Sequence, residues 1–415
     1  MLAHSPPLPL TVDYHSKDGI TAEDEEGILL VLGQRHRVRH LRLILPVQNL
    51  WKFVMAIDEE FPILEYLIVG PVVDDSTALM LPETLQAPNL RHLALGGFAS
   101  PMRSRLHPTA VSLVTLFLRI SHQSAYFQPN ILLQSISFMP QLETLAVFFS
   151  FPVPNRDVER QLTHTAITTH ITLPNLRFIN FGGVSAYLEA VVCRITTPRL
   201  EGLEIQLFKQ LTFSVPSLQQ FMNRTNLRFD KAVIMFKDDV IFAEIFSREA
   251  DTCRLGISVD CWHLDWQVSS AAQISNALSQ VFSTVELLTL RHGVHSRSSE
   301  EHNDVDRIEW RKLLRSFNNV KTLRVGDGLV EELSRYLRLE DGELPLELLP
   351  ELQDLAYSGS GDAGDAFTSF IDSRKNAGRS VTAIRHNPNP SQSSFTVETP
   401  VMISASGEAG NDLDA

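Results

Sequence analysis

One short unit recurs along most of the chain and constrains its fold more than any other feature. Residues 173–208 contain it twice, as two runs of the form L-x-x-L-x-L that follow Pro174 and Pro198. Between them, residues 185–196 carry apolar side chains at i, i+3, i+4 and i+7, the spacing of an amphipathic helix. The stretch therefore predicts a strand, a helix and a second strand that repeats the first.

The same unit returns on both sides of this stretch. In the first half of the chain its second apolar position recurs after 26, 26, 23, 29, 34 and 24 residues. Such spacing is typical of a solenoid, in which each repeat buries its apolar face by stacking on its neighbours. The pattern fades between residues 209 and 260, where the sequence predicts plain strands. The second apolar positions are Leu41, Leu67, Leu93, Leu116, Leu145, Ile179, Leu203, Leu288, Leu323 and Leu355.

The segments between the runs are long enough for helices, as parallel strands require. We therefore expect an α/β, leucine-rich-repeat-like solenoid with irregular repeats, a curved parallel sheet on its concave face and helices on its convex face. The solenoid is expected over residues 35–386. Residues 1–34 predict an irregular lead-in, and the Pro-, Ser- and acid-rich residues 387–415 predict a disordered acidic tail.

The composition limits the kinds of partner and the compartment that we expect for this chain. A formal net charge of -13 argues against a protein that binds nucleic-acid phosphates. Three cysteines are too few for a disulfide framework and favour a reducing compartment. The first residues do not resemble a signal peptide, and no apolar stretch is long enough to cross a bilayer. We expect a cytoplasmic or nuclear monomer that binds protein, with no nucleic-acid or membrane partner.

The third and fifth positions of each run should point away from the leucines, onto the concave face. Their mixture of aromatic, apolar and charged side chains is typical of a protein-binding surface. The alternative is a solvated face with ordinary exposed aromatic residues. The candidate protein-binding residues are His40, Arg42, Tyr66, His92, Thr115, Phe117, Thr144, Phe178, Asn180, Glu204 and Arg324.

The P-x-L-x-x-L-x-L units, the apolar helices between them and the closing FIDSRKNAGRSVTAIRH segment resemble one family. They look like the leucine-rich-repeat region of fungal F-box proteins of the kind expanded in mushroom-forming fungi, over about residues 35–386. The resemblance implies substrate recognition for a cullin–RING ubiquitin ligase. Residues 1–34 hold no L-P-x-E-[IL] motif, so the F-box itself is expected to be missing, and contact with the ligase adaptor depends on an F-box upstream. The Asn or Cys that follows a regular repeat is also replaced, by Val72, Phe98, Val184 and Phe208.

Motifs that would carry chemistry are weak. Residues 359–364 match G-x-G-x-x-G, but Asp362 would repel a pyrophosphate, so a turn is favoured over dinucleotide binding. His292, His295 and His302 lack the spacing of a metal site. The sequence predicts no catalytic residue, no metal and no cofactor, and thus a non-catalytic interaction module. A free-standing repeat scaffold and a divergent α/β enzyme remain the alternatives.

Overall fold

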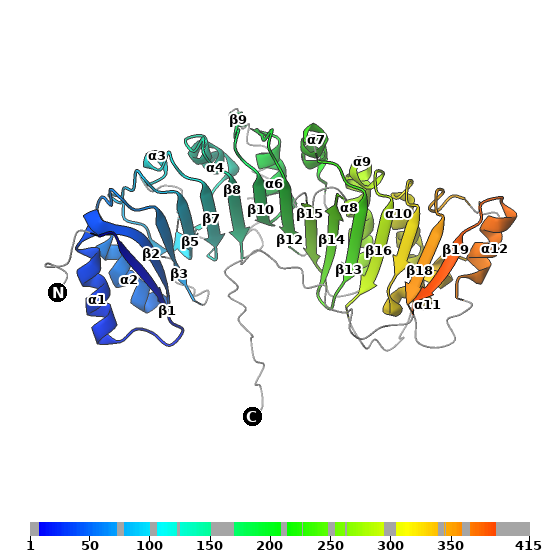
Figure 1. Cartoon of the computed structure of the whole chain (residues 1–415), viewed down its shortest axis with the longest axis horizontal. Coiled ribbons are helices and arrows are strands. Elements are labelled where there is room, and N and C mark those ends of the chain that lie inside the picture. Colours follow the sequence, from blue (N-terminus) through cyan, green and yellow to red (C-terminus); the bar gives the residue numbers. More distant parts are fainter. Residues whose placement is uncertain are drawn as a thin grey trace, which may run out of the picture. The chain divides into compact units, whose positions relative to one another are not determined.

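The computed structural model describes residues 8–72, 79–99, 106–122, 125–150, 170–208, 214–225, 227–247, 254–261, 264–293, 304–338, 344, 346–358 and 366–386. The chain divides into two compact units, whose described parts are residues 8–176 (unit 1) and 177–386 (unit 2). Each unit is an open, mostly parallel sheet with helices, shown in sequence colours in Figure 1. The prediction of an α/β fold with a mostly parallel sheet is confirmed.

Unit 1 places its principal strands in sequence order, β1-β2-β3-β5-β7-β8, and all of these neighbours are parallel. The strands of this sheet are β1 (Leu10–His15), β2 (Val38–Leu45), β3 (Tyr66–Pro71), β5 (His92–Gly96), β7 (Thr115–Ile120) and β8 (Thr144–Phe149). The helices are α1 (Ala22–Leu32), η2 (Arg35–Arg37), α2 (Val47–Ala56), α3 (Leu106–Thr109) and α4 (Pro129–Ile136). The short strands β4 (Leu79–Met80) and β6 (Phe98–Ala99) pair with each other, and β9 is Ile171–Thr172.

The leucines that the repeat pattern placed in the core do form one row. Leu41, Leu67, Leu93, Leu116 and Leu145 are direct partners on successive strands, and each is at most 3% exposed. Residues on one face of a strand alternate with those on the other, so this register fixes which side chains every strand turns away from the core.

The beginning of unit 1 corrects one expectation. Within residues 1–34, where the sequence predicted an irregular lead-in, the structure forms β1 and α1, and β1 pairs with β2. The Thr21 hydroxyl oxygen accepts a hydrogen bond from the Asp24 amide at 3.1 Å and caps α1. The acidic run Glu23–Glu25 therefore occupies the first turn of a helix, where negative charge is favourable.

Unit 2 begins and ends with parallel strands but departs from sequence order in between. Its strand order is β10-β12-β15-β14-β13-β16-β17-β18-β19. The strands are β10 (Phe178–Gly183), β12 (Gly202–Leu207), β13 (Lys231–Phe236), β14 (Val240–Phe246), β15 (Arg254–Asp260), β16 (Leu287–His292), β17 (Thr322–Val325), β18 (Asp354–Ser358) and β19 (Thr382–His386), with β11 at Ile195–Thr196. The helices are α6 (Ser185–Val192), α7 (Pro216–Arg224), α8 (Leu264–Ala277), α9 (Ser279–Phe282), α10 (Asp304–Arg315), η5 (Asp327–Leu329), α11 (Val330–Tyr336) and α12 (Thr368–Asn376).

The region where the repeat faded is an inverted antiparallel meander. The chain leaves β12, passes two strand positions to form β13, and returns through β14 to β15 beside β12. Buried Gln267 of α8 holds this reversal, because its side-chain NH₂ donates to the carbonyl oxygens of Lys237 at 2.5 Å and Cys261 at 2.9 Å. The sequence indicated strands here but not their order.

Neighbouring strand–helix units are also joined by asparagines at a position that sequence analysis overlooked. Asn89, Asn175 and Asn319 each precede the first apolar residue of a run, and each amide donates to a backbone carbonyl of the preceding strand–helix unit. The acceptors are the carbonyls of Pro62, Pro140 and Ser283 at 2.6, 3.1 and 2.6 Å. Of the apolar replacements noted in the sequence, Phe98 and Val184 are buried, while Val72 and Phe208 are half-buried.

Candidate functional site

The third positions of the runs lie in one row on unit 1, on the face opposite the leucine core. We call this surface the open face. His40, Tyr66, His92, Thr115 and Thr144 are direct partners on neighbouring strands, and all five are half-buried. The structure thus brings together five of the predicted binding residues. The register of the core leucines is what aligns them.

Three of these side chains form a continuous ring stack. The ring centroids of His40 and Tyr66 are 5.0 Å apart with planes inclined by 25°, and those of Tyr66 and His92 are 4.2 Å apart and inclined by 11°. The stack ends at Thr115, whose hydroxyl lies 3.1 Å from His92 Nδ1. Neighbouring strands are about 4.8 Å apart, which suits stacked rings. Because the ring faces contact each other, the row has mainly ring edges to offer a partner.

The fifth positions form a second row beside the first. Arg42 is held by an ion pair with Asp13 at 3.0 Å. Further along this row Phe117 stands half-buried, with its ring centroid 5.6 Å from that of Phe148 on β8. Phe148 was not among the predicted residues, although its position two residues beyond the fifth places it on the same face. The open face thus combines the apolar rings of Phe117 and Phe148 with the polar ring edges of the neighbouring stack.

The ionisation of His92 is perturbed by its surroundings. Burial lowers its pKa below the ordinary value, and the positive charge of Arg91 lowers it further, as does His40. The carboxylates of Glu65 and Glu143 oppose this shift. The neutral imidazole is therefore favoured in the folded protein.

The stability of unit 1 should fall on acidification because of His92. With a folded-state pKa below the unfolded-state value, the unfolded chain binds more protons, so stability rises with pH across that window and is lost as pH falls through about 6.5. Between about pH 7.5 and pH 5, urea unfolding should show that the free energy of unfolding falls less steeply in His92→Asn than in the wild type. Thr115→Val keeps the imidazole and should keep the slope. Identical slopes in the wild type and His92→Asn would contradict this assignment.

Unit 2 groups three of the four remaining predicted residues. Phe178 and Asn180 lie on β10, and Asn180 is the direct partner of Glu204 on β12. The guanidinium of Arg177 lies 5.6 Å from the Phe178 ring centroid. Arg324 belongs to the same row but lies on β17, beyond the meander strands and β16. The structure therefore does not bring Arg324 to the other three.

Sequence analysis missed the aromatic residues of the meander. Phe242 and Phe246 are half-buried on β14, and the ammonium of Lys237 lies 4.6 Å from the Phe242 ring while that of Lys231 lies 5.5 Å from the Phe246 ring. Alternation in the segment VIFAEIF was the available signal. Without the antiparallel pairing, the side on which these rings lie could not be assigned.

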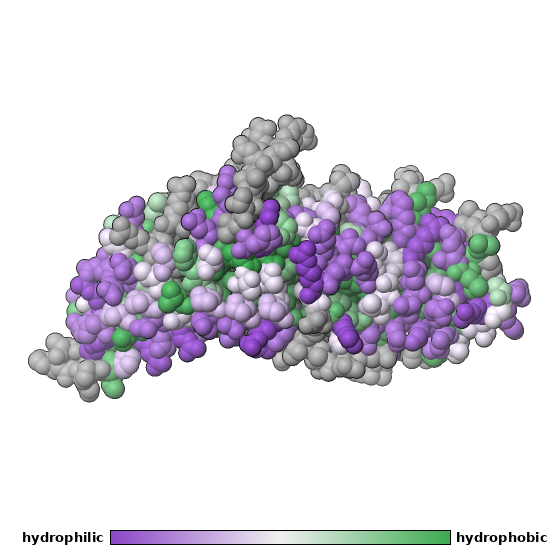
Figure 2. Space-filling model, turned by 90° about the horizontal axis from the view of Figure 1, so that it is seen from above, coloured by the Kyte–Doolittle hydropathy of each residue, from purple (hydrophilic) through white to green (hydrophobic). Residues whose placement is uncertain are grey.

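A groove beside the open face was missed as well. It runs along the edge at which β3, β5, β7 and β8 begin and has a volume of about 480 Å³. In Figure 1 the arrows of β7 and β8 point down, so Figure 2, seen from above, looks onto this edge, where hydrophilic residues are mixed with small apolar areas. Two residues shortly before each of these four strands line the groove: Ile63, Glu65, Asn89, Arg91, Ser112, Val114, Gln141 and Glu143.

Among the described residues, no group of three or more His, Cys, Asp or Glu side chains could hold a metal ion. His295, His302 and the glycine-rich residues 359–364 lie outside the described residues. Within the described part of the chain, no helix combines the length and apolar character needed to cross a membrane. No protein-family model matches the sequence, and the search of curated proteins found no match.

Proposed function

We propose that this chain is a non-catalytic protein-interaction module, a leucine-rich-repeat-like solenoid whose open face binds a protein partner. By its resemblance, the module corresponds to the substrate-recognition region of an F-box ubiquitin-ligase receptor, so the partner would be a protein to be ubiquitinated. The in-register leucines and the parallel strand–helix units of both sheets support the repeat interpretation.

The observation that carries the proposal is the open face of unit 1. The stack of His40, Tyr66 and His92 lies beside the Phe117–Phe148 ring pair. Amphipathic rings fixed by their neighbours lose little conformational entropy on binding, and aromatic residues dominate the energetics of protein interfaces. A surface of this kind suits protein recognition better than chemistry, which requires converging titratable groups in a closed pocket.

Removing two rings from the open face should weaken partner capture while leaving the fold intact. We expect Tyr66→Ala combined with Phe117→Ala to reduce binding about tenfold or more, because each truncation of an interface aromatic costs about 1–2 kcal/mol. Trp51→Ala is the matched control, since Trp51 is 49% exposed on α2. Quantitative affinity capture of full-length variants measures the effect. Undiminished capture by the double variant would place the binding surface elsewhere.

The ligase link needs a separate measurement. If the chain serves a cullin–RING ligase, a form that carries an F-box should recover the ligase adaptor together with the partner. Recovery of a stable partner without the adaptor by every form would favour the alternative, a free-standing repeat scaffold. The same capture experiment, read out by mass spectrometry, distinguishes these outcomes.

A further inference from the structure

The second positions of the runs in unit 1 form a row of their own, which we call the pre-strand row. It consists of Arg39, the second residue of β2, and of Glu65, Arg91, Val114 and Glu143, which directly precede β3, β5, β7 and β8. Consecutive members are joined by backbone hydrogen bonds, in which each amide donates to the carbonyl of the preceding member at 2.8 or 2.9 Å. Except at Val114, the charges alternate in sign along the row.

Several neighbouring residues of opposite charge at these positions form ion pairs, although Glu65 pairs with Arg39 and not with Arg91 on its other side. In unit 1, Arg39 contacts Glu65 at 2.9 Å. The corresponding positions of unit 2 pair in the same way. Arg177 and Glu201 form a bidentate contact at 2.8 and 2.5 Å, and Lys321 contacts Glu286 at 2.8 Å.

Val114 interrupts this pairing. Arg91 and Glu143 stand on either side of it, two strand spacings or about 10 Å apart along the sheet, and no ion pair joins them in the described structure. Both side chains are exposed, and neither makes an ion pair or side-chain hydrogen bond with another described residue, although the charges of both act on His92. The row therefore presents one positive and one negative group with a neutral gap between them.

The groove coincides with this gap. Arg91, Val114 and Glu143 all line it, together with Ser112 from the same strand–helix unit as β7 and with Glu65, whose carboxylate is already paired with Arg39. The short side chains of Ser112 and Val114 thus occupy the middle of the groove, between the two charged groups. The Asn89 side chain also lines the groove, near Arg91. Its amide nitrogen donates to the Pro62 carbonyl, which fixes the orientation of the Asn89 side chain.

We propose that this groove binds an extended segment of the partner protein, with an acidic side chain at Arg91 and a basic side chain at Glu143. This inference rests on the proposed function. An extended chain rises about 3.3 Å per residue and turns alternate side chains to opposite faces, so an acid and a base two or four positions apart, about 7 or 13 Å, face the groove together and match the gap most nearly. A free amino acid carries its two charges within about 4 Å and cannot reach both groups. A nucleic-acid backbone supplies only negative charge and would be repelled by Glu143.

The test uses a panel of extended ten-residue peptides of Ser, Thr and Gly, each with one Glu and one Lys at separations from one to six positions. Peptides with Glu alone, Lys alone or neither are the controls. Binding of labelled peptides to the full-length chain is measured by fluorescence anisotropy. We expect tighter binding at separations of two and four positions than at one, three or five, and weakening of about fivefold or more when either charge is removed.

Variants assign the two contacts. Arg91→Ala should weaken binding of the Glu/Lys peptide but not binding of the peptide with Lys alone. Glu143→Ala should weaken binding of the Glu/Lys peptide but not binding of the peptide with Glu alone. Val114→Lys should abolish selectivity because the new ammonium pairs with Glu143. Arg177→Ala, at a corresponding but ion-paired position of unit 2, is the matched control and should change nothing.

Two results would overturn the proposal. One is a panel in which no Glu/Lys peptide binds more tightly than the uncharged peptide. The other is binding that persists unchanged in Arg91→Ala and Glu143→Ala. Failure here is distinguishable from failure of the proposed function. If Tyr66→Ala with Phe117→Ala abolishes capture of the partner while the groove variants capture it normally, the open face binds and the groove does not.

Discussion

Replacing Leu93 with Asp is expected to unfold unit 1. The Leu93 side chain is 1% exposed and lies between its direct partners Leu67 and Leu116. A carboxylate at this position would lose its hydration without gaining a basic partner, which costs several kcal/mol, and the lost leucine packing adds about 2–5 kcal/mol. Because domains are stable by only about 5–15 kcal/mol, the folded population should collapse.

The neighbouring residue provides the control. Ala94 follows directly but points to the open face, where it is half-buried. Ala94→Asp introduces the same charge one residue away and should lower the free energy of unfolding by much less. Circular dichroism, urea titration and solubility of the two variants give the comparison. A soluble Leu93→Asp protein that melts cooperatively near the wild-type temperature would refute the repeat register.

This register explains what the sequence could predict. The L-x-x-L-x-L spacing identifies the buried face of a strand, whatever the length of the helix that follows. The core row and the open face therefore follow from the alternation of side chains along each strand. The acidic start of α1 was misread because Glu23–Glu25 has little apolar periodicity, and the Thr21 cap that precedes it was not recognised. The order of the meander depends on contacts such as those of Gln267, which no local pattern encodes.

The candidate site shows the same limit. Alternation places His40, Tyr66 and His92 on one face, but only the pairing across strands shows that their rings stack. The gap at Val114 is less visible still. Arg91 and Glu143 are 52 residues apart in the chain, so their shared groove emerges only once the strands are aligned.

The second large effect is expected in unit 2, at Arg374 of α12. This arginine is completely buried, and its guanidinium donates to the carbonyl oxygens of Leu348 at 3.0 Å and Pro350 at 3.1 Å. Between these acceptors Leu349 has a φ of 50°, a left-handed conformation that is uncommon for any residue other than glycine. Arg374 thus holds a strained turn from one side.

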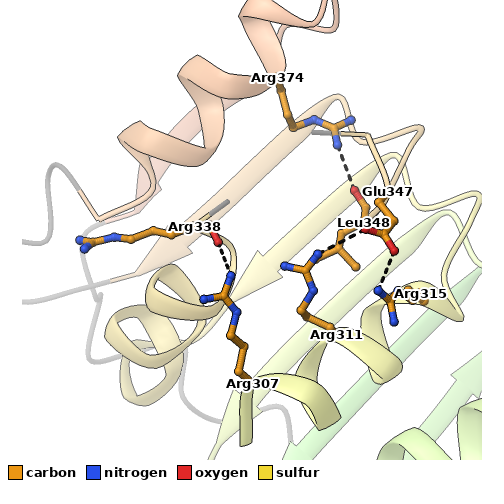
Figure 3. A network of polar contacts seen from close by, with 7 residues as sticks. All are labelled: Arg307, Arg311, Arg315, Arg338, Glu347, Leu348 and Arg374. Carbon is orange, nitrogen blue, oxygen red and sulfur yellow. Dashed lines mark hydrogen bonds and ion pairs between the residues drawn. The ribbon is translucent and has the colours of Figure 1, made fainter. Parts of the chain in front are cut away.

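The other side of the turn is held by α10. Glu347, directly before Leu348, accepts from Arg315 at 2.6 Å and contacts Arg311 at 3.4 Å. Figure 3 shows the guanidinium groups of Arg311 and Arg315 converging on Glu347 from this helix, while Arg374 reaches Leu348 from α12. The segment that precedes β18 is therefore fixed between two helices by charged hydrogen bonds, which are stronger than neutral ones.

Arg374→Met should destabilise unit 2 by about 2–4 kcal/mol, because it keeps much of the apolar volume but leaves the two inward-facing carbonyls without donors. The expected fall in Tm is about 5–10 °C. The Tm of Arg374→Lys should lie between those of the wild type and Arg374→Met, since one ammonium group cannot reproduce the forked guanidinium that reaches both carbonyls. Lys375→Met is the matched control, because Lys375 is exposed on the same helix and should change Tm little. Calorimetry of the three variants decides the matter: an Arg374→Met protein with the wild-type Tm would show that the turn stands without its arginine.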